Sequence, residues 1–150
     1  MELDLSKIKK IHFIGIGGIG ISAIARMMEM EGKKVSGQDL NENEIVKDLK
    51  NAGIEITIGQ AFENIPAGTE LIVYTVAIET YDPELFARLK AQEIPIRSYP
   101  QMLGIVSKDK YTIAICGTHG KTTTTGMIAH MMRELDPTVV IGSLLVGTKS

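Results

Sequence analysis

Short apolar runs alternate along this chain with longer segments whose apolar residues recur every three or four positions. The short runs predict strands at residues 11–15, 34–37, 54–58, 70–75 and 94–97. The longer segments predict helices at residues 18–31, 44–52, 82–92 and 99–106. Strands that alternate with helices are typical of a parallel sheet with crossover helices. The pattern therefore predicts an α/β fold, with a Rossmann-like parallel sheet of about five strands.

The alternation is interrupted by a polar break, Lys108-Asp109-Lys110, and then begins again. After the break we expect a strand at residues 111–116, a helix at 121–135 and a strand at 138–141. These roughly forty residues are too few to bury a core of their own. We therefore expect one Rossmann-like domain over residues 1–107 and the truncated start of a second domain over residues 108–150.

A first glycine-rich turn, Gly15-Ile16-Gly17-Gly18-Ile19-Gly20, follows a predicted strand and opens a predicted helix. In that setting glycines allow a tight turn and let the backbone approach a diphosphate at the helix N-terminus. Asp39 lies nineteen residues after Gly20, where its carboxylate can accept from a ribose hydroxyl or cap the next helix. The turn predicts a diphosphate site, and the alternative that its glycines serve packing alone stays open.

A second glycine-rich turn, Gly117-Thr118-His119-Gly120-Lys121-Thr122, carries a lysine and a hydroxyl at a predicted strand-to-helix junction. Such a turn points backbone N–H groups at phosphates, while the lysine neutralises charge and the hydroxyl reaches Mg²⁺. Ile115 stands where the full Walker pattern has its outer glycine, so the loop is shorter. Threonines at 122–125 are poor helix formers, which a role in phosphate or metal binding explains. The turn predicts nucleoside triphosphate binding.

Composition and charge narrow the class of protein. The net charge of −2 gives no electrostatic case for nucleic-acid binding. The single cysteine, Cys116, excludes an intramolecular disulfide, and its place in an apolar run predicts a small core residue. No apolar run approaches the roughly 18–20 residues that span a bilayer, and there is no secretory signal, so we expect no membrane insertion and a cytoplasmic protein.

Two further polar residues lie at predicted strands. His12 stands next to the first turn, where a polar edge position is a simpler interpretation than contact with a substrate. Arg97 ends the fifth predicted strand, at the edge where open α/β sheets bind ligands. A surface salt bridge and a ligand contact both stay open for Arg97.

The two turns together resemble the Mur ligases of peptidoglycan synthesis. The resemblance rests on residues 14–22 and 117–124, and it extends over essentially the whole chain. His119 is typical of the branch that adds L-alanine to UDP-N-acetylmuramate and of the murein-peptide branch, and the intact turn at residues 17–20 favours the first. The family often has Pro-Arg-Ala-Glu-Met-Leu where residues 98–103 read Ser-Tyr-Pro-Gln-Met-Leu. No role is therefore carried over to Tyr99 or Gln101.

This resemblance implies an ATP-dependent, amide-forming ligase of cell-wall synthesis, with UDP-N-acetylmuramate and L-alanine as substrates. It implies catalytic roles for Lys121 and Thr122, with Thr122 also holding Mg²⁺. For ATP it implies contacts with Gly117, Thr118, His119, Gly120, Lys121, Thr122 and Thr123. For the UDP-sugar it implies contacts with Gly15, Gly17, Gly18, Ile19, Gly20, Ser22, Asp39, Thr75 and Ala77.

Mur ligases have three domains and about three times this length. The resemblance therefore implies that residues 1–107 form the UDP-substrate domain, that residues 108–150 begin the P-loop domain, and that the chain alone is inactive. Two other classes stay open. An NAD-binding module of an oxidoreductase or sensor fits the first turn and Asp39 but has no use for Lys121. A stand-alone P-loop protein would lack a sheet to hold its loop.

Overall fold

A five-stranded, all-parallel sheet forms the centre of the molecule, in the order β3-β2-β1-β4-β5. The computed structural model describes residues 3–108 and 110–141. The strands are β1 (Lys10–Ile14), β2 (Lys34–Asp39), β3 (Glu55–Ile58), β4 (Leu71–Tyr74) and β5 (Ile96–Ser98). The predicted α/β fold is confirmed, and each of the five predicted strands is present with ends shifted by one or two residues.

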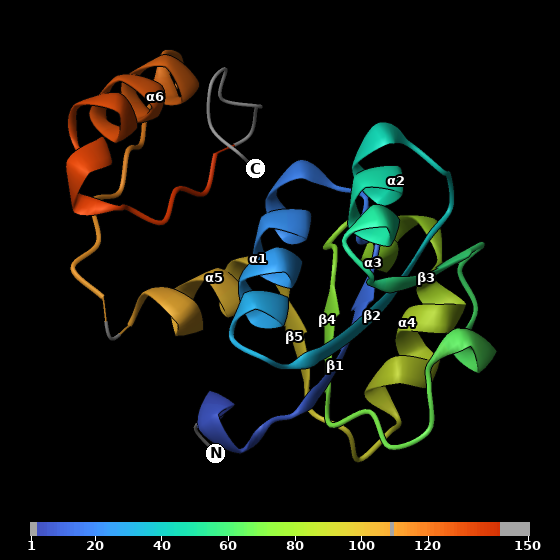
Figure 1. Cartoon of the computed structure of the whole chain (residues 1–150). Helices are drawn as coiled ribbons and strands as arrows, with labels where there is room; N and C mark the ends of the chain where they lie inside the picture. Colours follow the sequence, from blue (N-terminus) through green and yellow to red (C-terminus); the bar gives the residue numbers. More distant parts are fainter. Residues whose placement is uncertain (1–2, 109, 142–150) are drawn as a thin grey trace.

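Helices cover both faces of this sheet (Figure 1). They are α1 (Ile19–Met30), α2 (Glu44–Asn51), α3 (Ile78–Tyr81), α4 (Pro83–Lys90) and α5 (Tyr99–Ser107), followed by α6 (Lys121–Met131). Short 3-10 turns lie at Leu5–Lys7, Phe62–Asn64 and Arg133–Leu135. The one-turn helix α3 was not predicted, because four residues are too short to show a helical period.

Side chains of β1 alternate between two apolar clusters, as the pleat of a strand requires. Ile11 and Phe13 pack with α1 and α5, in a cluster that also holds Met28 and Met102. Ile14 faces the other way, into a cluster with residues of β4 and α4 such as Ile72 and Leu89. The central strand is therefore buried on both faces, and its carboxyl end is held rigidly where the first glycine turn begins.

Local capping explains where three of the helices start. Asn43 caps α2 by accepting from Val46 N, and Asp82 caps α4 by accepting from Leu85 N, with Pro83 at the first helical position. Ser98 begins α5 with a capping box. The sequence predicted the Asp82 cap correctly. Helix α1 starts at Gly18 without a side-chain cap among the described residues, which leaves its first amides open.

After residue 110 the structure departs from two predicted strands. Residues 111–116 and 138–141 are extended but do not pair with a strand in the described part of the chain, and α6 ends at Met131 rather than at residue 135. A strand exists only where a neighbour accepts and donates its backbone hydrogen bonds, and the sheet does not extend to these residues. Cys116 is consequently exposed, so its prediction as a core residue was wrong. Figure 1 shows α6 beyond α5, away from the sheet.

Candidate functional site

The first glycine turn lies at the carboxyl edge of the sheet, between β1 and β4. Gly15 N and Ile16 N both donate to Gln38 O, at 2.8 and 3.2 Å, and Thr75 N donates to Ile14 O at 3.0 Å. Gly15 has φ +77°, a conformation that glycine adopts without strain. The chain runs outward from β1 through β2 to β3 on one side and then crosses to β4 on the other side of β1, so this is the switch point where open α/β sheets bind ligands.

Three glycines of this turn are required by packing. A Cβ on Gly15 would lie 2.5 Å from Thr75 Cγ2, and a Cβ on Gly17 would lie 2.8 Å from Val46 Cγ2. A Cβ on Gly20 would lie 2.5 Å from Tyr99 Oη. The spaces that these glycines leave open are therefore filled by the protein itself. A ligand at this turn would have to use backbone N–H groups rather than the room beside those three residues.

A clamp of two side chains fixes Gly17. Its N–H donates to Asp39 Oδ2 at 2.8 Å, and its carbonyl accepts from Asn43 Nδ2 at 3.0 Å. Asn43 Oδ1 also accepts from Val46 N at 2.9 Å, so the same side chain caps α2. Asp39 therefore does not cap that helix, and its contact is with the turn. Sequence reasoning missed Asn43, although an asparagine just before a helix is a recognisable cap signal.

The amides that remain for an anion are those of the first turn of α1. The first amides of an α-helix have no acceptor within the helix, and they point along the positive end of its dipole. Residues 19–21 occupy these positions, whereas Ser22 N already donates to Gly18 O at 2.9 Å. The Ser22 hydroxyl is buried and donates to Ile19 O at 2.8 Å, which makes it a weaker candidate than its sequence position indicated.

Thr75 and Ala77 lie on the β4 side of the first glycine turn. The Thr75 methyl packs against Gly15, and the exposed Ala77 begins α3. Gln60 also lies here, with Nε2 at 3.8 Å from the position of a Gly15 Cβ, and the Tyr81 hydroxyl donates to Gln60 Oε1. Gln60 and Tyr81 were not singled out from the sequence, because Gln60 lies in the loop after β3 and Tyr81 at the end of α3, and only the fold brings them together near the turn.

The second glycine turn is exposed and bonded mostly to itself. Gly120, at φ +78°, precedes α6, and Lys121 Nζ donates to Gly117 O at 2.5 Å and to Thr118 O at 3.3 Å. Thr124 N donates to Gly120 O at 2.9 Å, which leaves the amides of residues 121–123 without an acceptor in the helix. His119, Thr122 and Thr123 are solvent-exposed around them.

This arrangement fits a triphosphate. A cation lies over a loop whose following helix presents free N–H groups, which is the donor set that phosphate oxygens need. No group of three or more His, Cys, Asp or Glu in the described residues could hold a metal ion by itself.

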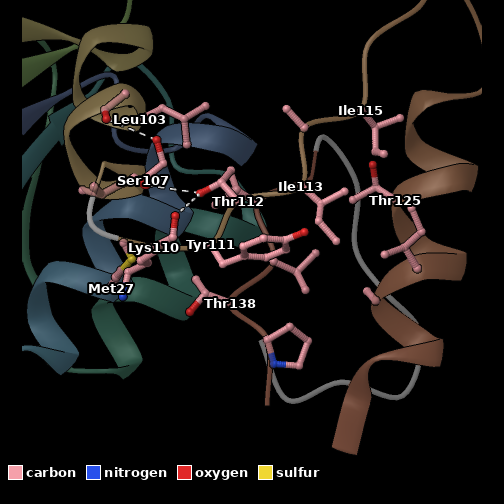
Figure 2. A pocket seen from close by; sticks show the side chains of 18 of the residues that line it. Met27, Leu103, Ser107, Lys110, Tyr111, Thr112, Ile113, Ile115, Thr125 and Thr138 are labelled. Atoms are coloured by element: carbon pink, nitrogen blue, oxygen red, sulfur yellow. Dashed lines mark hydrogen bonds between the residues drawn. The ribbon is translucent and has the colours of Figure 1, made fainter. Parts of the chain in front are cut away.

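A cavity of the described residues lies elsewhere. It has a volume of about 690 Å³ and lies between α5 on one side and α6 with residues 111–115 on the other. Figure 2 shows Met27 and Leu103 on one wall and Ile113, Ile115 and Thr125 on the other. Neither glycine turn lines it, and its surface is mainly apolar. The donor chemistry at the two turns, rather than this cavity, identifies the candidate sites.

The structure also describes the surroundings of His12 and Arg97, the two polar residues noted at predicted strands. His12 is 1% exposed in the middle of β1, so the predicted edge position was wrong; the neighbouring strands β2 and β4 enclose it. Burial lowers its pKa from 6.5 to about 4. Arg97 is half-buried and Nη1 donates to Ile96 O at 2.8 Å. A ligand contact for Arg97 stays a prediction.

A parallel α/β sheet with an uncapped helix start at its switch point places the chain in the Rossmann-like class of folds. The family model described as "Mur ligase family, catalytic domain" matches residues 10–111. The chain belongs to the Mur ligase family, as the two turns indicated.

Relatives with known names indicate a branch of the family to which the chain is similar. The chain is 44% identical over 147 residues to the UDP-N-acetylmuramate–L-alanine ligase of Agathobacter rectalis, covering 96% of this chain and 32% of the relative. It is 45% identical over 148 residues to the enzyme of that name from Geotalea uraniireducens, covering 96% and 32%. The chain thus spans about a third of the length of the curated relatives it matches.

Solved structures agree with this fold. The UDP-N-acetylmuramate–alanine ligase of Thermotoga maritima superposes with a TM-score of 0.76 at 36% identity, over 85% of this chain and 30% of that one. A murein peptide ligase of Psychrobacter arcticus has the same TM-score at 28% identity, over 85% and 27%. No helix within the described residues has the length and apolar character needed to cross a membrane.

Proposed function

We propose that this chain is the N-terminal part of an ATP-dependent ligase that joins L-alanine to UDP-N-acetylmuramate in peptidoglycan synthesis. The relatives that carry this name match almost all of the chain, including both glycine turns. The observation that carries the proposal is the combination of two helix starts in one chain, at α1 and at α6, each preceded by a glycine turn and without a side-chain cap, which is the arrangement that suits phosphate groups. A single-nucleotide protein would need only one.

The UDP diphosphate would bind at the start of α1. There the amides of residues 19–21 are open, whereas Gly17 N–H already donates to Asp39. Asp39 would then support substrate binding indirectly, because its carboxylate fixes the position of Gly17. Its remaining lone pairs could still accept a hydrogen bond from a ribose hydroxyl. Gly15, Gly18, Thr75 and Ala77 would form the walls of the crevice.

ATP would bind at the second turn, where Gly117, Thr118, His119, Gly120 and Thr123 surround the start of α6. Lys121 would neutralise charge on the transferred phosphoryl group, and Thr122 would hold Mg²⁺. In the complete enzyme the muramate carboxylate becomes an acyl phosphate, which the amine of L-alanine attacks to form the amide. Lys121 and Thr122 are therefore the proposed catalytic residues of this chain.

The same proposal assigns residues 1–107 to a UDP-substrate domain and residues 108–150 to the start of an ATP-binding domain. Residues 111–116, which lack a paired neighbour in the described part of the chain, support a unit that needs further strands for its sheet. We propose that the chain alone is inactive as a ligase and that the complete enzyme works in the cytoplasm, where ATP is available.

Parallel calorimetric titrations of the chain with UDP-N-acetylmuramate, NAD⁺ and ATP-Mg²⁺ test this proposal. Binding of the uridine nucleotide with no heat from NAD⁺ supports it. Tight NAD⁺ binding without a response to the uridine nucleotide would overturn it in favour of a dinucleotide-binding module. Because the phosphate groups of these ligands share chemistry, UDP alone serves as the control that separates nucleotide binding from recognition of the sugar.

A further inference from the structure

A buried chain of polar side chains runs beneath the first glycine turn, centred on Gln38 of β2. Gln38 is fully buried, and its backbone carbonyl accepts from both Gly15 N and Ile16 N, at 2.8 and 3.2 Å. These are the two amides at which β1 leaves the sheet. The position of one carbonyl oxygen thus determines where the glycine turn begins.

The side chain of Gln38 also holds the loop on the far side of the turn. Its Oε1 accepts from Ala61 N at 2.8 Å and from Asn64 Nδ2 at 3.2 Å. Asn64 Nδ2 in turn donates to Gly59 O at 3.1 Å, which closes this loop. The loop carries Gln60 toward Gly15, so Gln38 connects both sides of the crevice.

The hydrogen bonds of Gln38 also determine the state of His12. A backbone N–H can only donate, so the Gln38 atom bonded to Ala61 N must be the carbonyl oxygen. The Gln38 amide nitrogen therefore donates to His12 Nε2, at 3.1 Å. His12 Nε2 must then be unprotonated, and Nδ1 carries the hydrogen that is donated to Ser36 Oγ at 2.9 Å.

Both neighbours of the His12 ring are neutral, and burial is the only cause of its lowered pKa. The ring therefore stays neutral at physiological pH and keeps Gln38 in one orientation. Flipping the Gln38 amide would place its NH₂ against the Ala61 N–H and its oxygen against the unprotonated His12 Nε2, so that the hydrogen bonds on both sides would be lost, which is costly.

We infer that Gln38, oriented by the Nδ1–H tautomer of His12, is the positioning residue of the first glycine turn. It ties Gly15, through its backbone carbonyl, and the loop at residues 59–64, through its side chain, to one buried residue before any ligand arrives. The consequence of this arrangement for substrate binding rests on the proposed function. The hydrogen bonds of Gln38 within the protein do not depend on that proposal.

Two substitutions at Gln38 and one matched control test the inference in the full chain. Gln38→Leu removes both side-chain anchors. Gln38→Glu keeps an acceptor for Ala61 N but replaces the donor to His12 with a second acceptor. Gln92→Glu makes the same chemical change at an exposed residue after α4, at the opposite edge of the sheet. The readouts are the ¹⁵N signals of the His12 ring, the amide signals of Gly15 and Ala61, and the affinity for UDP-N-acetylmuramate.

We expect the wild-type ring to show the Nδ1–H tautomer at pH 7. In Gln38→Glu the ring should become protonated at Nε2, because the carboxylate can only accept there. Gln38→Leu should shift the amide signals of Gly15 and Ala61 and weaken the binding of UDP-N-acetylmuramate about tenfold or more. The affinity of Gln38→Glu should lie between that of Gln38→Leu and that of the wild type. Gln92→Glu should change none of these.

An Nε2–H tautomer in the wild-type chain would overturn the inference, as would unchanged Gly15 and Ala61 amides in Gln38→Leu. If Gln38→Leu does not fold, the His12 ring signals of Gln38→Glu decide the matter alone. If the wild-type chain binds no uridine nucleotide, the proposed function fails, but the ring and amide signals still test the positioning role of Gln38.

Discussion

Each of the two glycine turns of this chain holds a glycine in the left-handed region, but the surroundings of those two glycines are opposite. Gly15 and Gly120 have φ values of +77° and +78°. Gly15 is buried against Thr75 and bonded to Gln38, whereas a Cβ on Gly120 would meet nothing within 4 Å. A phosphate-binding turn is therefore preorganised by the sheet and helices around it, and the sequence of the turn alone does not supply that order.

The difference also indicates what each turn can do in this chain. The first turn has a complete sheet, a clamp at Gly17 and a hydrogen-bonded loop beside it. The second is followed by a helix whose Met127 and Met131 are exposed, and among the described residues Lys121 bonds to carbonyls of its own loop. We expect the first turn to bind its ligand in the isolated chain and the second to need the rest of its domain.

The largest contrast should come from the same substitution at the two matched glycines. Gly15→Ala should lower the free energy of unfolding by about 4 kcal/mol, because left-handed backbone strain adds to overpacking against Thr75. Gly120→Ala should lower it by about 1 kcal/mol or less, because only backbone strain applies. Urea denaturation of both variants measures the difference. Equal losses would show that the first turn is no better packed than the second.

Acid should destabilise the region around the first glycine turn, called here the first region, through protonation of His12. Its folded pKa of about 4 lies below the unfolded value of 6.5, so the unfolded chain binds the proton more readily between these values. Stability should therefore fall by about 3 kcal/mol as the pH is lowered from 6.5 to 4. Urea denaturation across this range should show a flatter pH dependence for His12→Gln.

The exposed histidine of the second turn provides the control for that experiment. His119→Gln should leave the pH dependence of the wild type unchanged, because the ring contributes no buried group to the fold. A flattening with His119→Gln, or none with His12→Gln, would contradict the assignment of acid sensitivity to the first region.

A smaller effect is expected from the clamp on Gly17. Asn43→Ala removes the cap of α2 and the donor to Gly17 O, and should cost about 1–2 kcal/mol of stability. Asn41→Ala is the matched control, because only the backbone N–H of Asn41 bonds to Asp39. Thermal or urea unfolding distinguishes them. Identical stabilities for the two variants would show that the clamp does not hold the turn.

The smallest effect on stability is predicted at the second turn. Lys121→Met should change the free energy of unfolding by less than about 0.5 kcal/mol, because its ammonium is exposed and, in the part of the chain that the structure describes, bonds within the loop. In the complete enzyme the same variant should reduce ligase activity by a factor on the order of 10²–10³, since charge on the phosphoryl group is no longer neutralised. A stability loss comparable to that of Gly15→Ala would contradict the contrast between the turns.

Local signals in the sequence were sufficient for the five strands, the position of the first turn and the Asp82 cap, because period, glycine spacing and capping residues act over a few positions. They were insufficient for His12, whose burial depends on strands paired to either side of β1. Gln38 and Gln60 lie in different parts of the chain, and only the fold brings each of them close to Gly15. The error at Cys116 has the opposite cause: an apolar run predicts a core strand, but the described residues supply no sheet beside it.

An amide-resolved titration of the ¹⁵N-labelled chain with UDP-N-acetylmuramate tests the central contrast most directly. The account predicts that the largest shifts fall on residues 15–21 and 75–77, while the amides of residues 117–123 stay unchanged. Shifts concentrated at residues 117–123, with none at the start of α1, would contradict it.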